Sequence, residues 1–598
     1  MLPVPSGEKG GATGAGTSAK EHFKVAEVRD AFGRCCTPDI AHLAQGWLRG
    51  GALGALNVKM TVGIVVGEAG VLWYSIKDKK EVVMARENWT SSIGFILASA
   101  GSAIGLGNVW KFPYMAGSNG GGSFVFVYLL CVFLIGLPVM CSEMFVGRFT
   151  RRNVINALGK VEQLSGSVVG RVALCSLSGA AAVLFATMQA WLLSAMALFG
   201  VWAFLKRGYA ALGWVCCALS FVILSYYAVV GGWIVEYVWR SLTASFAGVD
   251  GGSASEVAKT SIEAFGAYAG NPWRVLVGFL IFMGLTSAVI LGGIQAGIER
   301  VSKVLMPALF VLLLVVIVRS VTLPGAWEGV VFLLKPTKAG FTPKVMMMAL
   351  GQAFFSLSLG MAITVTYGSY LSKKQSILKA AGWVGILDTM AALLAGLAIF
   401  PAVFAAGLAP SAGPGLVFGA LPATFAAMPL GAVWATCFFF MLLIAAVTSS
   451  ASLLECMATV LIERLRKGHH RASRRSAVWI SLVACTLLGL VSVFSTIDWS
   501  WLPGLEKVVG WSLGALKQNN WFDTVDNLAS NWGLPFAALG IALLIGWVFG
   551  PRRTAEGLLA EQEQPSGVIL AVWKFSIRWV APVAILAVFL TMSGLLKL

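Results

Sequence analysis

Long apolar runs alternate with short polar loops along most of this chain. A bilayer core of about 30 Å requires about 20 apolar helical residues to cross. Runs of that length lie near residues 92–116, 124–146, 212–241, 273–293, 302–320, 345–371, 380–406, 430–462, 477–496, 532–549 and 570–595. The pattern predicts an all-α polytopic membrane protein with about eleven core transmembrane helices.

Composition supports the same class. The chain is 58% hydrophobic and 12% charged, with a mean hydropathy of +0.81, whereas soluble domains are about 25% charged. A soluble enzyme, a disordered protein and a secreted disulfide scaffold are therefore excluded. The cysteines have no metal-ligand spacing, and the four histidines lie outside the apolar runs. Without a nucleophile–base pair, metal cluster or phosphate-binding loop, the sequence indicates a protein that is not an enzyme.

The net charge of +17 comes from short basic clusters between apolar runs, which is typical of cytoplasmic loops rather than of a nucleic-acid surface. Basic loops follow the second, sixth, eighth and tenth runs, whereas 242–272, 407–429 and 497–531 hold few bases. The loop at 321–344, with three lysines, is an exception. The alternation predicts a multi-pass protein of the inner (plasma) membrane with a cytoplasmic N-terminus and an external C-terminus.

Two segments stand outside this pattern. An uncharged stretch at 172–205 has basic residues on both flanks, so it crosses the membrane twice or not at all. We expect a helical hairpin or a membrane-embedded insertion near 163–203. Residues 1–85 form an N-terminal extension with scattered charges. They are either a disordered cytoplasmic tail or a region upstream of a true start at Met84.

Two of the apolar runs are interrupted at mid-membrane depth. The first contains three glycines (Gly101, Gly105 and Gly107) followed by Asn108, and the sixth contains two serines and a glycine within 354–360. Broken helices at corresponding places in two halves point to the binding site of a transporter. Close helix packing through Gly-x-x-x-Gly and serine back-bonding are the structural alternatives.

Ionisable and hydroxyl side chains add a second line of evidence. Asp388 lies inside the seventh run, and a buried acid in a bilayer needs a partner, for which a bound cation is the obvious choice. Thr448-Ser449-Ser450 in the eighth run offers hard oxygen ligands. Glu143, one turn from Arg148, is explained as well by an interfacial ion pair as by any function.

Several spaced motifs together carry a family resemblance. Asn88-Trp89, the segments 101–114, 119–122 and 352–360, Tyr226-Tyr227 and the segment 445–450 resemble the neurotransmitter:sodium symporter family, in its bacterial amino-acid transporter branch. The resemblance implies the LeuT-type fold, a 5+5 inverted repeat in which helices 1 and 6 are broken. Residues 86–320 would form the first repeat, 345–549 the second, and 550–598 the eleventh helix and C-terminus.

The same resemblance implies two sodium sites. The first would use the Ala103 carbonyl, Asn108, Ser356 and Asp388 together with the substrate carboxylate. The second would use the carbonyls of Gly101, Ile104 and Ala445 and the hydroxyls of Thr448 and Ser449.

It also implies a substrate site. The substrate carboxylate would meet Leu106, Gly107 and Tyr227, next to Ala103 and Ser356. The substrate side chain would lie among Ser102, Ile223, Phe355, Ser358, Met361, Ser449 and Leu453.

Gates and a hinge follow from the family pattern as well. Lys111 with Asp526 would form the outer charged pair, and Arg86 with Glu463 the inner pair. Gly297 and Pro307 resemble the motif at which the fifth helix unwinds.

Two positions refine the expected function. Gly105 stands where amine transporters carry an acid, which leaves room for a substrate that brings its own carboxylate. Asp388 stands where many animal relatives have Asn and use chloride, so transport should not need chloride. The sequence thus predicts sodium-coupled import of an apolar or aromatic amino acid by alternating access. A sodium-dependent membrane sensor, or a structural subunit that does not transport, is the alternative.

Overall fold

The computed structural model describes residues 64–65, 71–72, 88–166, 168–187, 190–244, 254–407, 410, 416–426, 428–468, 473–495, 504, 520–558 and 567–592. The chain divides into two units, 1–84 and 85–598. In the first, strands β1 (Ile64–Val65) and β2 (Val71–Leu72) pair antiparallel. The rest of the N-terminal extension lies outside the described residues, so the expectation of disorder there stays a prediction. Arg86 of the expected inner gate is outside them as well.

In the second unit, helices are the only regular secondary structure among the described residues. Its first five spans are α3 (Ser92–Ala103) with η1 (Gly107–Lys111) and α4 (Phe112–Ser118), α5 (Gly122–Cys131) with η2 (Val132–Gly136) and α6 (Leu137–Thr150), α10 (Tyr209–Leu242), α12 (Pro272–Leu291), and η3 (Gly293–Glu299) with α13 (Arg300–Val321).

The remaining spans follow in the predicted order. They are α15 (Pro343–Ser356) with α16 (Ile363–Gly368), α17 (Ile377–Ala405), α19 (Gly431–Gly468), α20 (Arg474–Phe494), α22 (Trp521–Asn527) with η8 (Leu528–Gly533), α23 (Leu534–Leu543) and η9 (Leu544–Phe549), and α25 (Gly567–Phe575) with η10 (Ser576–Val580) and α26 (Ala581–Met592).

Shorter helices connect the spans. They are α7 (Val154–Ser165), α8 (Val169–Thr187), α9 (Trp191–Arg207), α11 (Ala254–Ala269), α14 (Ala326–Leu334), η4 (Lys338–Gly340), η5 (Leu416–Ala420), α18 (Leu421–Ala426) and α24 (Pro551–Leu558). In the described part of the chain, ten helices are long and apolar enough to cross a membrane, and the bent pair α3–α4 makes an eleventh. These include α8 of the insertion; the sixth span is split into two halves that fall below the required length.

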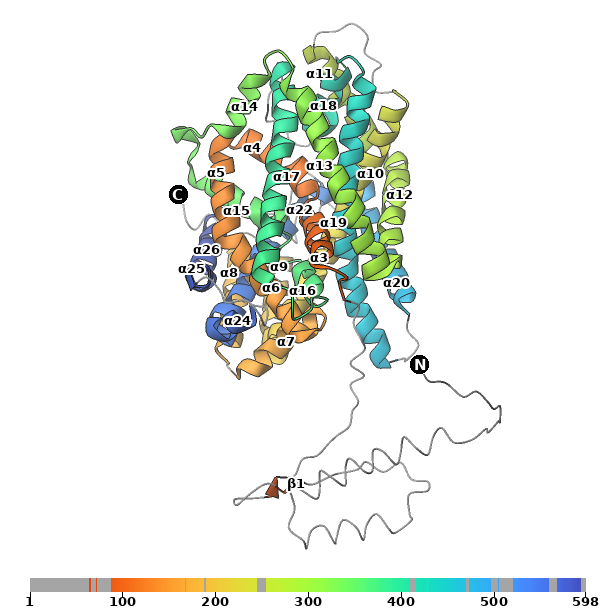
Figure 1. The fold of residues 1–598 in the computed structure, drawn as a ribbon. Helices are drawn as coiled ribbons and strands as arrows, with labels where there is room; N and C mark the ends of the chain where they lie inside the picture. Colours follow the sequence, from red (N-terminus) through yellow and green to blue (C-terminus); the bar gives the residue numbers. More distant parts are fainter. Residues whose placement is uncertain are drawn as a thin grey trace, which may run out of the picture. The chain divides into compact units, whose positions relative to one another are not determined.

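The long helices run side by side as a bundle with α3 and α4 near its middle (Figure 1). Helix α3 packs against α13, α17 and α19, and α10 packs against α19, α12 and α20. Helices α11, α14 and α18 gather at one end of the bundle and α7 and α24 at the other. We call these the α11 end and the α7 end. The start of α3 lies at the α7 end, because Gln375 links Ser92 to Arg148, near the end of α6.

The first span breaks where the sequence predicts. Helix α3 begins at an N-cap in which Ser91 Oγ accepts a hydrogen bond from Gly94 N at 3.0 Å. It ends at Ala103, and the chain bends by 48° before the helix resumes at Gly107. A Cβ on Gly107 would lie 2.9 Å from the Phe355 ring. Glycine is therefore required for the two broken spans to approach this closely.

The sixth span is interrupted by residues with positive φ angles. Ser358, Gly360 and Ala362 have φ angles of 54°, 75° and 64°, a left-handed region that costs energy for residues with a Cβ. Glu143 of α6 accepts a hydrogen bond from the freed Gly360 N at 2.9 Å. The predicted breaks in helices 1 and 6 are thus both present, and the second is stabilised by a buried carboxylate.

The insertion is a helical hairpin formed by α8 and α9. Ser194 Oγ donates to the Ala182 carbonyl across the hairpin at 2.8 Å, and Phe185 near its tip packs on Trp532 with ring centroids 5.4 Å apart. Glu162 holds both ends of the hairpin, because its carboxylate binds Arg171 Nε at 2.6 Å and Tyr209 N at 2.9 Å. Entry and exit therefore lie together, as the basic flanks predicted.

Candidate functional site

A cavity lies between the two breaks, bordered by α10 and α19. The residues that line it are Ala103, Gly105, Gly107, Ile223, Tyr227, Phe355, Ser358, Met361, Ser449 and Leu453. The structure thus brings together all of the residues expected at the substrate site except Ser102, Leu106 and Ser356. Gly105 is the addition: a Cβ there would lie 2.8 Å from Ser449 Oγ and 2.9 Å from the Tyr227 hydroxyl. Only glycine leaves this part of the cavity open.

The expected residues that do not line the cavity make hydrogen bonds next to its lining. The Ser102 carbonyl accepts hydrogen bonds from Ser358 Oγ at 3.2 Å and from Ser449 Oγ at 3.0 Å. Leu106 N donates to the Tyr227 hydroxyl at 3.2 Å. The cavity therefore has apolar walls from α10, α15 and α19 and a polar floor of unwound backbone, which is the arrangement of a small-molecule site.

Asp388 is the centre of a buried polar cluster beside this cavity. Its carboxylate is fully buried. It accepts hydrogen bonds from Asn108 Nδ2 at 2.8 Å, from Ser356 Oγ at 2.7 Å and from the Tyr128 hydroxyl at 3.3 Å. Three spans meet at one negative charge, and carboxylate, amide and hydroxyl oxygens are the ligands that hard cations prefer. The donor set therefore fits a sodium ion.

Three of the residues expected at a second cation site, Gly101, Ala445 and Thr448, also lie together. Gly101 of α3 faces Thr448 of α19, because a Cβ on Gly101 would be 3.4 Å from Thr448 Cβ. Thr448 Oγ1 donates to the carbonyls of Ile444 and Ala445 at 3.0 and 3.1 Å, and its lone pairs remain available to a cation. Ile104 is fully buried at the end of α3. The described residues contain no cluster of three or more His, Cys, Asp or Glu.

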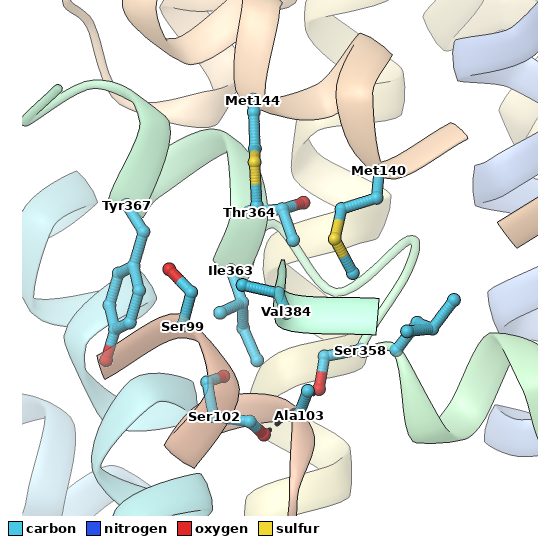
Figure 2. A pocket seen from close by; sticks show the side chains of 11 residues that line it. Ser99, Ser102, Ala103, Met140, Met144, Ser358, Ile363, Thr364, Tyr367 and Val384 are labelled. Atoms are coloured by element: carbon cyan, nitrogen blue, oxygen red, sulfur yellow. Dashed lines mark hydrogen bonds between the residues drawn. The ribbon is translucent and has the colours of Figure 1, made fainter. Parts of the chain in front are cut away.

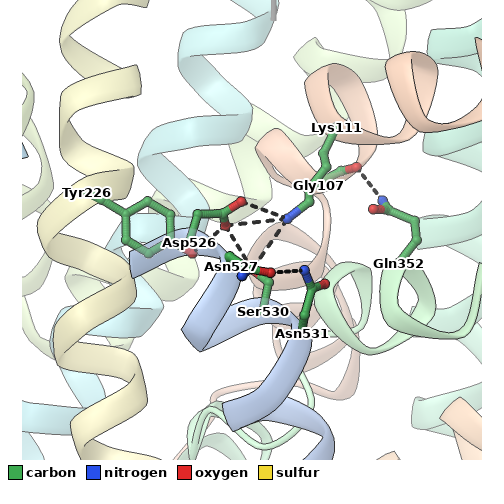
Figure 3. Close-up of polar contacts among 8 residues, drawn as sticks. All are labelled: Gly107, Lys111, Tyr226, Gln352, Asp526, Asn527, Ser530 and Asn531. Atoms are coloured by element: carbon green, nitrogen blue, oxygen red, sulfur yellow. Dashed lines mark hydrogen bonds and ion pairs between the residues drawn. The ribbon is translucent and has the colours of Figure 1, made fainter. Parts of the chain in front are cut away.

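A charged pair covers the cavity. Lys111 Nζ lies 3.3 Å from Asp526 Oδ2 and 4.4 Å from the centre of the Phe355 ring. Tyr226 and Ser530 also donate to Asp526 Oδ1, at 2.9 and 2.8 Å. Figure 3 shows the polar side chains of this group converging from η1, α10, α22 and η8. The structure thus brings together the residues expected at the outer gate.

Comparison with known proteins decides the family. A profile of the Sodium:neurotransmitter symporter family matches residues 86–198 and 254–595. A Bacillus subtilis protein named "Uncharacterized sodium-dependent transporter YhdH" is 36% identical over 513 residues, which cover 85% of this chain and 98% of that protein. The chain belongs to the sodium:neurotransmitter symporter family.

Solved and animal relatives agree with this assignment. The crystal structure of MhsT in complex with L-phenylalanine matches with a TM-score of 0.66 and 35% identity, over 85% of this chain and 99% of that one. The rat "Sodium- and chloride-dependent GABA transporter 2" is 27% identical, over 80% of this chain and 75% of the transporter. The symporter therefore has the LeuT-type fold with its 5+5 inverted repeat. It is a multi-pass membrane protein that uses sodium and takes a small-molecule substrate.

At the α7 end of the symporter, Glu463 binds a different element from the one expected. Its carboxylate accepts hydrogen bonds from Asn153 N at 2.9 Å, and from the side chains of Asn153 and Asn156 at 2.5 and 3.0 Å. Both asparagines belong to the start of α7. The expected pairing of Glu463 with Arg86 stays a prediction, because Arg86 is outside the described residues.

The expected hinge lies at the start of the fifth span. Gly297 is part of the π-helical turn η3, and a Cβ on it would lie 2.1 Å from the Val289 carbonyl. Pro307 interrupts α13 ten residues later. Two residues that weaken helices therefore flank the segment 298–306 at the start of the fifth span.

A second cavity, not anticipated from the sequence, lies between α3, α6, the broken sixth span and α17 (Figure 2). The hydroxyls of Ser99 and Tyr367 line it, both side chains are at least 94% buried, and neither finds a hydrogen-bond partner among the described residues. It shares Ala103 and Ser358 with the first cavity. A water molecule is the natural partner for such buried hydroxyls.

Two further site residues escaped sequence reasoning. Tyr128 belongs to the Asp388 cluster, and an aromatic hydroxyl within an apolar run was the available signal, since buried Tyr usually has a partner. Glu143 was explained equally well by an ion pair with Arg148. Instead its carboxylate binds Gly360 N and the Thr364 hydroxyl, whereas Arg148 donates to the carbonyls of Gln375 and Gly557. Glu143 is therefore part of the helix-6 break.

Proposed function

We propose that this symporter imports an amino acid with an apolar or aromatic side chain, coupled to sodium at two sites, without chloride, by alternating access. The observation that carries the proposal is the Asp388 cluster. A buried carboxylate is placed beside the polar floor of a closed cavity, where a cation would lie next to the substrate.

The proposed first sodium site consists of the Ala103 carbonyl, Asn108, Ser356 and Asp388. The second consists of Gly101, Ile104, Ala445, Thr448 and Ser449. The first sodium would also contact the substrate carboxylate, so each ligand should tighten the binding of the other by the same factor. The membrane potential adds about 2.3 kcal/mol per charge for each 100 mV.

The cavity walls support an amino acid with an apolar or aromatic side chain. Ile223, Phe355, Met361 and Leu453 surround the space beside the unwound backbone, and Met adapts its shape to different side chains. MhsT, 35% identical, has L-phenylalanine bound in its crystal structure. At the floor, the Tyr227 hydroxyl and the backbone at Leu106 and Gly107 would hold the substrate carboxylate.

Asp388 supports chloride independence. A buried cation needs a compensating negative charge, and this carboxylate supplies one without a bound anion. Some family members, such as the rat protein described as chloride-dependent, are named for both ions. A fixed acid at position 388 is a physical reason for this chain to differ.

We further propose that the α7 end faces the cytoplasm of a cell with this protein in its inner membrane. Arg148 near the end of α6, and Arg151 and Arg152 between α6 and α7, lie at that end, and basic loops are retained on the cytoplasmic side. Lys111 and Asp526 would then form the outer gate, and Glu463 with Arg86 the inner one.

Uptake into proteoliposomes tests the function. Labelled phenylalanine, tryptophan and leucine are supplied under an inward gradient of sodium gluconate, sodium chloride or potassium chloride. We expect concentrative uptake of at least one of them in both sodium salts and none in potassium. Sodium-dependent binding without uptake would indicate the sensor or structural role, and uptake only in sodium chloride would refute chloride independence.

A further inference from the structure

The start of α3 is held by the fifth span through one carboxylate. Glu299, 1% exposed, accepts hydrogen bonds from Thr90 N at 2.9 Å and from Thr90 Oγ1. Lys303 Nζ lies 2.7 Å from Glu299 Oε1 and 3.3 Å from Thr90 Oγ1. One turn earlier, Gln295 Nε2 donates to the Asn88 carbonyl at 2.8 Å. Three successive turns of the fifth span thus bind the segment that leads into α3.

The electrostatics of this contact are favourable. The first N–H groups of a helix have no partners within the helix, and its N-terminus carries a partial positive charge. The Glu299 carboxylate binds Thr90 N, which precedes the N-cap Ser91, and its negative charge stabilises the positive end of α3 electrostatically. The contact is tight, because a Cβ on Gly94 would lie 2.0 Å from Glu299 Oε1.

The same carboxylate lies next to the hinge. Glu299 is the last residue of η3, two residues after Gly297. The backbone at Gly297 lies close to the preceding turn, since a Cβ there would be 2.1 Å from the Val289 carbonyl, and Glu299 belongs to the same π-helical turn. Movement at the hinge and release of α3 would therefore break one set of hydrogen bonds.

We propose that Glu299 is a positioning residue that latches the start of α3 to the hinge of the fifth span and so keeps the α7 end closed. The proposal rests on the alternating-access cycle proposed above. Unwinding near Gly297 withdraws the carboxylate from Thr90, and α3 then loses its anchor at the moment the α7 end opens. Trp89 holds the other side of this segment, since its Nε1 donates to the Tyr367 carbonyl at 3.1 Å.

Two substitutions break the latch by different means. Glu299→Gln removes the charge and retains the shape. Gly94→Ala does not change Glu299 itself, but the methyl group of the new alanine would occupy the position of the Glu299 carboxylate. Because the second change is steric and favours helix formation, it tests the latch even where the first variant folds poorly. Glu162→Gln is the matched control: like Glu299, Glu162 pairs with a basic side chain and accepts a backbone N–H, but it holds the α8–α9 hairpin and not α3.

Accessibility of a cysteine in place of Ser99 reports the opening. Ser99 is 6% exposed and lies on α3. The reporter is built in a background in which all ten native cysteines are replaced by serine or alanine, and purified protein is labelled with a small polar thiol reagent in sodium or potassium chloride. We expect sodium to slow labelling of the parent, and both latch variants to be labelled roughly tenfold faster than the parent in sodium, as the loss of one charge-assisted hydrogen bond implies.

Each outcome is decisive. Faster labelling in Glu299→Gln and Gly94→Ala, with Glu162→Gln at the parental rate, supports the latch. A parental rate in either latch variant, or an equal acceleration in Glu162→Gln, overturns it. If sodium does not change the labelling rate of the parent protein and the parent shows no uptake, the proposed function is contradicted. The latch is tested separately, because it still requires both variants to be labelled faster than the parent in either salt.

Discussion

Neutralising Asp388 is the most direct test of the sodium-site assignment. Asp388→Asn preserves the size of a fully buried side chain and one of its acceptor oxygens, so the hydrogen bond from Asn108 can remain. What it removes is the negative charge at the meeting point of Asn108, Ser356 and Tyr128.

The size of the effect follows from Coulomb's law. Opposite unit charges about 4 Å apart attract by about 4 kcal/mol at an effective dielectric constant near 20, which corresponds to a factor of about 1,000 in affinity. Neighbouring oxygens and water recover part of this. We therefore expect the apparent sodium affinity to fall by roughly 100- to 1,000-fold, and substrate binding to weaken with it because the two are linked.

The assay is a sodium titration of thermal stability in sodium gluconate and in sodium chloride at constant ionic strength. Glu236→Gln, which neutralises an acid paired with Arg240 in α10, is the control and should keep the parental affinity. Wild-type protein should give the same curve in both salts. If Asp388→Asn binds sodium as tightly as the wild type in gluconate, Asp388 is not a sodium ligand.

Three further outcomes follow from the geometry. Gly105→Ala should reduce substrate affinity at least tenfold in an equilibrium binding assay, because its methyl group would lie 2.9 Å from the Tyr227 hydroxyl; unchanged affinity would contradict the cavity as the site. Lys111→Gln should slow uptake several-fold whereas Lys111→Arg retains it, since only the charge is needed to pair with Asp526; equal rates in both variants would contradict a gate. Tyr367→Phe should leave Tm within about 2 °C of the wild type, because the deleted hydroxyl has no hydrogen-bond partner among the described residues; a drop well beyond that would reveal a strongly bound water.

The fold was predictable because membrane insertion constrains backbone and charge so strongly. Apolar runs of the required length gave the spans, and the glycines and serines within two of them located the breaks at 104–106 and 357–362. Basic flanks on both sides of 172–205 predicted either a hairpin or a membrane-embedded insertion, and did not distinguish the two. The bend of the first break and the left-handed backbone at Ser358 and Ala362 could not be read from composition, because they depend on packing against other spans.

A candidate site residue could be predicted where a single ionisable side chain lay within an apolar run. Asp388 in an apolar run is such a residue. Glu143 was ambiguous because Arg148 is near in sequence, whereas its partner Gly360 lies 217 positions away. Glu299 gave no signal, since an acid beside Arg300 at the head of a span resembles any interfacial charge. Only the tertiary structure reveals that it holds α3.

The position of Glu162 has a practical consequence. The Glu162 carboxylate binds both the beginning of α8 and the beginning of α10. The two ends of the α8–α9 hairpin therefore lie close together. Replacement of residues 168–207 by a short glycine linker should leave the order of the later helices and the direction in which each crosses the membrane unchanged. The same junction is accordingly a natural place to graft a fluorescent module without disturbing the transport core.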